Sequence, residues 1–87
     1  MEEIVAAAVF GGGVIWSLPA PNRHHNVLWE MDRVGVDAIL HGGPDAQGFV
    51  TSKGRFVTRD EAAEIAISAG QINSLQWPPY LYSEDLW

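Results

Sequence analysis

The chain has 87 residues and no cysteine, and eleven acidic against five basic residues give it a formal net charge of −6. A chain of this length forms one domain with a thin core, because it buries only about 60–65% of the surface that its unfolded form exposes. The missing cysteine excludes disulfides, thiol catalysis and Cys-bound metal, and it favours a reducing compartment. The acidic balance disfavours binding to nucleic acid or to an anionic membrane.

The first expected unit is a β-hairpin. Strands at Ile4–Phe10 and Val14–Trp16 flank the turn residues Gly11–Gly13, and Pro19 ends the second strand. Residues 4–18 are apolar, but two glutamates precede them and three glycines interrupt them. We therefore expect folded core here, rather than a secretory signal or a membrane-spanning segment.

A helix over Asn22–Val34 should follow. Asn22 is a good N-cap, because its side-chain oxygen can accept a hydrogen bond from a free amide of the first turn. Gly35 is well placed to end the helix. A short strand is expected at Val36–Leu40 and a loop at 41–45. The spacing predicts a buried stripe of Val27, Leu28, Met31 and Val34.

The second hairpin, Gly48–Thr58, is the clearest. Lys53-Gly54 suits a two-residue turn, which would place Phe49 and Phe56 on one face and Val57 on the other. Thr58 and Glu61 form a capping box that predicts a second helix. Residues 73–87 are aromatic and acidic, and we expect an extended tail packed on a single domain, 1–87. The predicted fold is α+β: an antiparallel sheet from two hairpins with two helices on one face.

Positive side chains crowd the start of the first helix. Arg23, His24 and His25 follow Asn22, although a helix N-terminus disfavours cations by a few tenths of a kcal/mol each. A phosphate or carboxylate at this point would meet amides, guanidinium and imidazole together. The alternative is that Arg23 and His25 are solvated and that His24 packs neutrally in the core.

The two histidines are also the candidate acid–base residues, because imidazole titrates near neutral pH. No HxxxH or HxxE spacing accompanies them, so no metal is expected, and nothing indicates a cofactor. A second basic cluster lies at Lys53 and Arg55 in the hairpin turn, with Arg59 just beyond. It either clamps a phosphate or is an ordinary solvated turn. The aromatic tail either completes the core or binds a basic groove on another protein.

The stretch GFVTSKGRFVTRDEAAEIAISAGQI, the ending LYSEDLW and the Arg-His-His helix start resemble a family of small phage and prophage accessory proteins. The resemblance implies expression in the host cytoplasm. It also implies a role against host defence, by sequestering or degrading a nucleotide signal or by blocking a defence protein.

Taken together, these features predict binding of a small anionic, nucleotide-like signalling ligand, sequestered or cleaved. Its phosphates would contact Asn22, Arg23, His24, His25, Lys53 and Arg55, and a tryptophan (Trp16, Trp29 or Trp77) would stack on a base. The alternative is a protein-binding inhibitor of a host defence protein, acting through its acidic surface and aromatic tail. A minor virion component is a third option. The thin core makes a homo-oligomer a further expectation.

Overall fold

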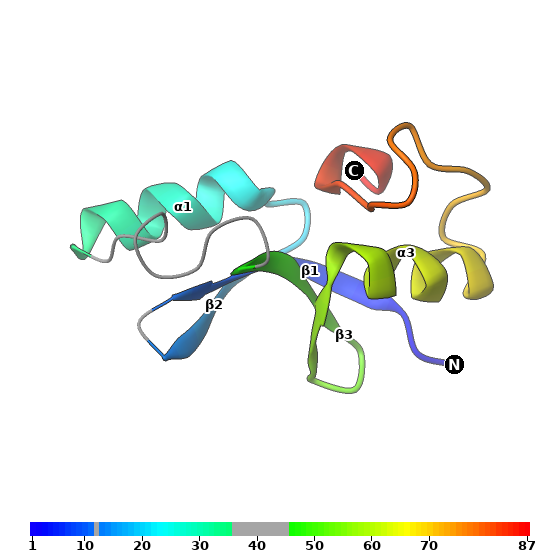
Figure 1. Cartoon of the computed structure of the whole chain (residues 1–87). Helices are drawn as coiled ribbons and strands as arrows, with labels where there is room; N and C mark the ends of the chain where they lie inside the picture. Colours follow the sequence, from blue (N-terminus) through cyan, green and yellow to red (C-terminus); the bar gives the residue numbers. More distant parts are fainter. Residues whose placement is uncertain (12, 36–45) are drawn as a thin grey trace.

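The computed structural model describes residues 1–11, 13–35 and 46–87, and it contains one antiparallel sheet with two helices on the same face (Figure 1). The strand order across the sheet is β2-β1-β3-β4. The predicted α+β class and two-layer arrangement are confirmed, and the predicted strand at Val36–Leu40 lies outside the described residues. The elements are β1 (Ile4–Gly11), β2 (Val14–Pro19), α1 (His24–Arg33), β3 (Gln47–Thr51), β4 (Phe56–Thr58), α3 (Arg59–Ser68) and the short 3-10 helix η2 (Ser83–Asp85).

The first hairpin forms as predicted, but β2 runs three residues further than expected, to Pro19. Pro19 is tolerated because β2 is an edge strand, where a missing amide hydrogen need not break a ladder on both sides. Trp16 stands opposite Val9 and Leu18 opposite Ala7, so these four side chains share one face of the sheet.

The core lies between that face and the helices, in two clusters. Val27 and Met31 of α1 pack on Val9 of β1. The second cluster lies under α3, where small side chains let the helix approach the sheet closely. Its fully buried members are Ala7, Phe49, Val57, Ala62, Ala66 and Leu81. Val34, predicted to be buried with α1, is exposed because the helix ends at Arg33.

The register of the second hairpin differs from the prediction by one residue. Val50 stands opposite Phe56, and Phe49 opposite Val57. The turn therefore holds three residues, Ser52 to Gly54, with Gly54 in the left-handed conformation at φ +79°. Because side chains alternate, this slip moves Val57 into the core with Phe49 and sends Phe56 to the other face of the sheet.

Gly48 of β3 makes that arrangement possible. A Cβ at this position would lie 2.1 Å from the main-chain oxygen of Val57 and 2.8 Å from Cζ of Phe56. The ring of Phe56 therefore lies across the strand at Gly48, in space that any side chain would occupy.

The tail returns to the helix side of the sheet and is anchored there. Leu81 and Ser83 are buried, and the Leu81 amide donates to the carbonyl oxygen of Arg59 at 3.1 Å. Figure 1 shows η2 above the point where the two helices begin. Among the described residues, no helix combines the length and the apolar character needed to cross a membrane.

We predict that Gly48→Ala lowers the free energy of unfolding by roughly 3 kcal/mol or more, since its Cβ would collide with main chain that has no room to move. Gly54→Ala is the matched control. Its Cβ meets open space, so only the left-handed backbone opposes it, at a cost of about 1–2 kcal/mol. Urea unfolding of both variants checks this, and equal losses would contradict the packing at Gly48.

Candidate functional site

The two helices begin beside each other, at the middle of the sheet. His24, the first residue of α1, contacts the carbonyl oxygen of Gly48 through Nε2 at 2.7 Å. Gly48 stands opposite Thr58, the N-cap of α3. Both helices therefore point their positively polarised ends toward one place, and they run apart from it in Figure 1. We call this place the helix junction and define it by Arg23, His24 and Arg59 with the covering tail residues Tyr82 and Trp87.

The start of α1 is one residue later than predicted, and a cation occupies its cap. Arg23 is the N-cap, with extended backbone, and its amide donates to Oδ1 of Asn26 at 2.8 Å. The predicted N-cap, Asn22, lies in the preceding turn, where its side-chain amide donates to the carbonyl oxygen of Pro19 at 2.8 Å. The N-cap moves to Arg23 because the side chain of Asn26, the third residue of the helix, accepts the hydrogen bond from the Arg23 amide, as the third residue of a capping box does.

The C-terminal tail packs over the start of α1. The guanidinium of Arg23 donates to the main-chain oxygen of Trp87, and the indole Nε1 of Trp87 donates to the carbonyl oxygen of Asn22 at 2.9 Å. Arg23 and Trp87 are both partly exposed. The guanidinium of Arg23 thus binds an oxygen that the tail supplies.

Arg59 is the second cation of the junction and lies at the first position of α3. Its Nη2 donates to Oε1 of Gln47 at 2.7 Å, and its guanidinium lies 4.7 Å from the centre of the Tyr82 ring. Its Nε is buried without a hydrogen-bond partner in the described structure. Burial lowers the pKa of this guanidinium, yet an arginine stays charged at neutral pH.

The two junction arginines differ from the other two. Arg33 pairs with Glu30, and Arg55 pairs with Glu2 through Nε at 2.7 Å. Hydrogen bonds from Arg55 and from Thr51 lower the pKa of Glu2 to about 2. Within the described ranges, neither Arg23 nor Arg59 makes an ion pair with an Asp or Glu side chain, although the chain has eleven of these acids; the nearby charge of Glu84 raises the pKa of Arg59. An acidic protein thus keeps a guanidinium group without an Asp or Glu partner at the start of each of its two described helices.

His24 is a core histidine. Its ring is buried and meets the ring of Phe49 edge-on, with the centres 4.9 Å apart. Because a carbonyl oxygen only accepts, Nε2 carries the proton and donates to Gly48. Burial lowers the pKa of His24; the hydrogen bond to Gly48 opposes this, and the nearby charge of Arg59 lowers the pKa further. His24 is therefore neutral, and its Nε2 is occupied.

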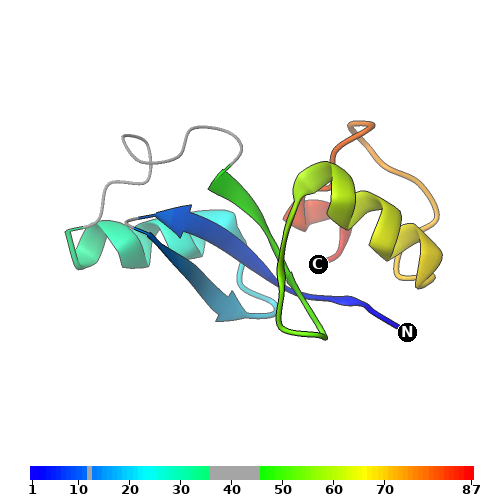
Figure 2. The ribbon, with the colours of Figure 1, turned by 60° about the horizontal axis from the view of Figure 1, so that its bottom comes forward.

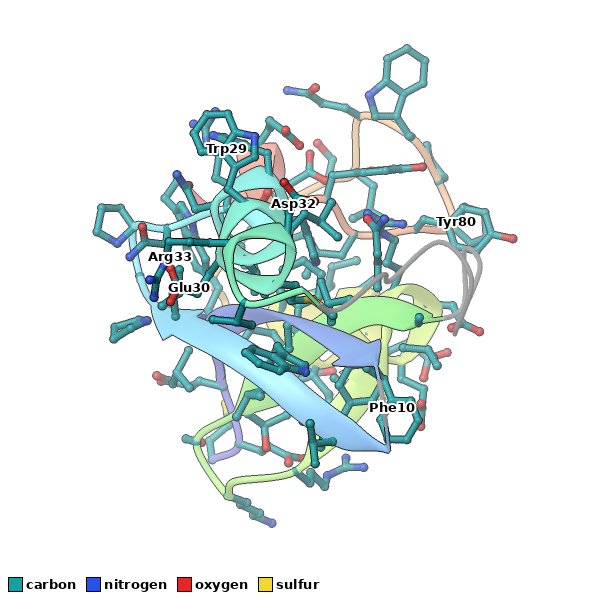
Figure 3. All side chains as sticks on the ribbon, turned by 90° about the vertical axis from the view of Figure 1, so that its left-hand side faces the viewer. Phe10, Trp29, Glu30, Asp32, Arg33 and Tyr80 are labelled. Carbon is teal, nitrogen blue, oxygen red and sulfur yellow. The ribbon has the colours of Figure 1, made fainter. Side chains whose placement is uncertain are left out.

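His25 is the exposed one of the two candidate acid–base residues. Its ring meets the ring of Trp29 edge-on at 5.0 Å between centres. Trp29 is 67% exposed, and Figure 3 shows it pointing away from the sheet. This pair offers an open aromatic surface one turn into α1.

Lys53 and Arg55 lie elsewhere, at the turn between β3 and β4. In the described part of the chain, no hydrogen bond or ion pair links this turn to the helix junction. Of the predicted site residues, the structure thus brings Asn22, Arg23 and His24 together, with His25 beside them. Across residues 1–11, 13–35 and 46–87, no three His, Asp or Glu side chains gather as a metal site. That no metal or cofactor is used stays a prediction.

Arg59, which lies close enough to His24 to lower its pKa, was not predicted to lie near the start of α1. The available signal was its position: a basic residue opens the acidic first turn of α3, as Arg23 precedes α1. Both contradict the usual preference for acids at helix starts.

Comparison with known protein families finds a match. A family model described as phage T4 y16D protein matches residues 3–87, which is all but the first two residues. No curated protein and no solved structure matches the chain.

The buried His24 predicts a pH dependence of stability. The pKa of His24 in the folded chain lies below its ordinary value of 6.5. As the pH falls below 6.5, His24 therefore binds a proton in the unfolded chain before it does so in the folded chain, and this favours unfolding. We expect the free energy of unfolding to decrease as the pH falls below about 7, and His24→Gln to remove the contribution of His24 to this slope. His25→Gln is the exposed control and should retain that contribution. Urea titrations at each pH measure the slope, and an unchanged slope in His24→Gln would contradict the neutral assignment.

Proposed function

Since this chain belongs to the family described as phage T4 y16D protein, we propose that it acts in the host cytoplasm as an anti-defence protein. It binds a small anionic, nucleotide-like signalling ligand at the helix junction. The observation that carries the proposal is Arg59, a half-buried guanidinium at the start of α3 whose Nε has no hydrogen-bond partner in the described structure, together with Arg23 at the start of α1.

The chemistry of the junction suits a phosphate. Guanidinium groups bind phosphate through parallel hydrogen bonds, and two helix N-termini add their positive ends. In the structure Arg23 binds the main-chain oxygen of Trp87, and Arg59 binds the neutral amide of Gln47. Hydrogen bonds to a charged acceptor are roughly twice as strong as those to a neutral one, so a phosphate that reaches the junction displaces the contact between Arg59 and Gln47.

An aromatic surface that could hold the base of such a ligand lies next to the helix junction. The exposed rings of His25 and Trp29 lie on the first turns of α1, next to Arg23. Stacking of a base on an aromatic side chain contributes about 1–3 kcal/mol. We favour sequestration over cleavage, because the Nε2 atom of His24 is held by Gly48 and only His25 is open for acid–base work.

The test is calorimetric titration with a panel of mono-, di- and cyclic nucleotides. Arg59→Gln should weaken the ligand that binds by about 10-fold or more, because a hydrogen bond to a charged group contributes about 1.5–3 kcal/mol. Arg23→Gln should do the same, and Trp29→Ala should weaken a base-containing ligand alone.

Arg55→Gln is the matched control, since Arg55 is paired with Glu2 away from the junction. It should leave the affinity unchanged. An equal loss in Arg55→Gln and Arg59→Gln would indicate non-specific charge attraction, and unchanged affinity in Arg23→Gln and Arg59→Gln would remove the junction as the site.

A second candidate function is a protein-binding inhibitor of a host defence protein, favoured by the exposed turn from Trp77 to Tyr80. The two rings are 66% and 49% exposed, and the Tyr80 amide donates to the carbonyl oxygen of Trp77 at 3.0 Å. Leu81 anchors the turn from behind, so its aromatic side chains are presented on an ordered loop. Ordered Trp and Tyr side chains are the usual anchors of protein interfaces, and the acidic surface would favour a basic partner.

This candidate predicts a different mutational pattern. If tagged protein is recovered from infected host cells, Trp77→Ala should reduce capture of its partner by at least about 30-fold, as expected for an interface anchor. Trp29→Ala, which changes an equally exposed tryptophan on α1, should not. Quantitative mass spectrometry measures both, and loss of the same protein in both variants would count against the turn as the specific anchor.

A further inference from the structure

None of the four strands carries a charged residue. Their sequences are IVAAAVFG, VIWSLP, QGFVT and FVT, so every Asp, Glu, Lys and Arg among residues 1–11, 13–35 and 46–87 lies outside these strands. Both faces of the sheet therefore lack charged side chains, but α1 and α3 cover only one of these faces (Figure 2).

The other face, which we call the open face, is apolar. Strand pairing places Ala8 beside Ser17 and Gly48, and Phe10 beside Ile15, on the side away from Val9. Figure 3 shows Phe10 on the opposite side of the sheet from α1. Phe10 and Ile15 are 42% and 46% exposed. The full set is Ala6, Ala8, Phe10, Ile15, Ser17, Pro19, Gly48, Val50, Phe56 and Thr58.

An antiparallel sheet with one face in water normally alternates apolar and polar residues, whereas a sheet covered on both faces is apolar throughout. This sheet has the second pattern. The packing supports the same interpretation: Phe56 lies across Gly48, and its ring centre is 6.5 Å from that of Phe10. Two aromatic rings thus form part of a continuous apolar surface that no described helix or tail segment covers.

We propose that a second copy of this chain covers the open face, forming a two-fold dimer in which the two sheets pack face to face. Charge argues for this occupant. Each chain carries −6, so two copies repel wherever their charged surfaces meet, and the open face is a surface on which no charge opposes the approach. A basic partner, by contrast, would find no acidic group there to pair with.

The geometry of sheet packing fits a self-complementary contact. Two sheets with the same twist pack about 10 Å apart with their strands nearly aligned, and a two-fold axis brings the same residues of both copies together. The extra burial supplements the thin core of an 87-residue chain. The helices and the tail lie on the far side of each sheet, so the helix junction of each copy stays accessible.

The experiment is sedimentation equilibrium of the whole chain from micromolar to millimolar concentration. The wild type should move from its 9.5 kDa chain mass toward twice that value. Phe10→Glu and Ile15→Glu should each stay monomeric throughout, because they place like carboxylates across the two-fold axis. Trp29→Glu, an exposed aromatic on α1, is the control and should dimerise like the wild type.

Phe10 lies on β1, an inner strand, so its effect separates face packing from pairing of β2 edges. Isotope-filtered NOEs between labelled and unlabelled wild-type copies give a readout that needs no variant, and they should connect Phe10, Ile15 and Phe56 across the interface. A wild type that stays monomeric at millimolar concentration overturns the proposal. So does a dimer that Phe10→Glu leaves intact while circular dichroism shows it folded, or one whose intermolecular NOEs involve other residues.

Discussion

The hydrogen bond from the buried imidazole of His24 to the carbonyl oxygen of Gly48 ties α1 to the centre of the sheet. Gly48 lies opposite Thr58, which caps α3, so the same point of β3 also sets where the second helix begins. The absence of a side chain at Gly48 lets Phe56 lie across the other face. The helix junction on one side and the apolar open face on the other therefore depend on one residue of β3.

The distribution of charge follows from this arrangement. The four strands are free of charged residues, and the described acids lie on the N-terminal segment, the helices and the tail. Arg23 and Arg59 are the exceptions among the arginines, because neither pairs with an Asp or Glu side chain of the described residues. A guanidinium held at a helix N-terminus is unfavourable by itself, and an anionic ligand would remove that cost.

Much of the fold could be predicted because local signals agreed: a glycine turn, the capping box at Thr58 and Glu61, and a helical stripe beginning at Val27. The register of the second hairpin could not, because Ser52-Lys53-Gly54 suits a three-residue turn as well as Lys53-Gly54 suits a two-residue one, and the burial of Val57 decides between them. The site was half predicted. The crowding of cations at the start of α1 was predicted, but Arg59 comes close to His24 only through the tertiary packing of the two helices.

The central claim is that the helix junction binds an anion, and the arginine side chains report on it directly. In ¹H–¹⁵N spectra of the arginine Nε–H groups, inorganic pyrophosphate or a bound nucleotide should shift the signals of Arg23 and Arg59 and saturate at one dissociation constant. The signals of Arg33 and Arg55, already paired with Glu30 and Glu2, should stay in place. Equal, unsaturated shifts of all four arginines, or no shift at Arg23 and Arg59, would contradict the account.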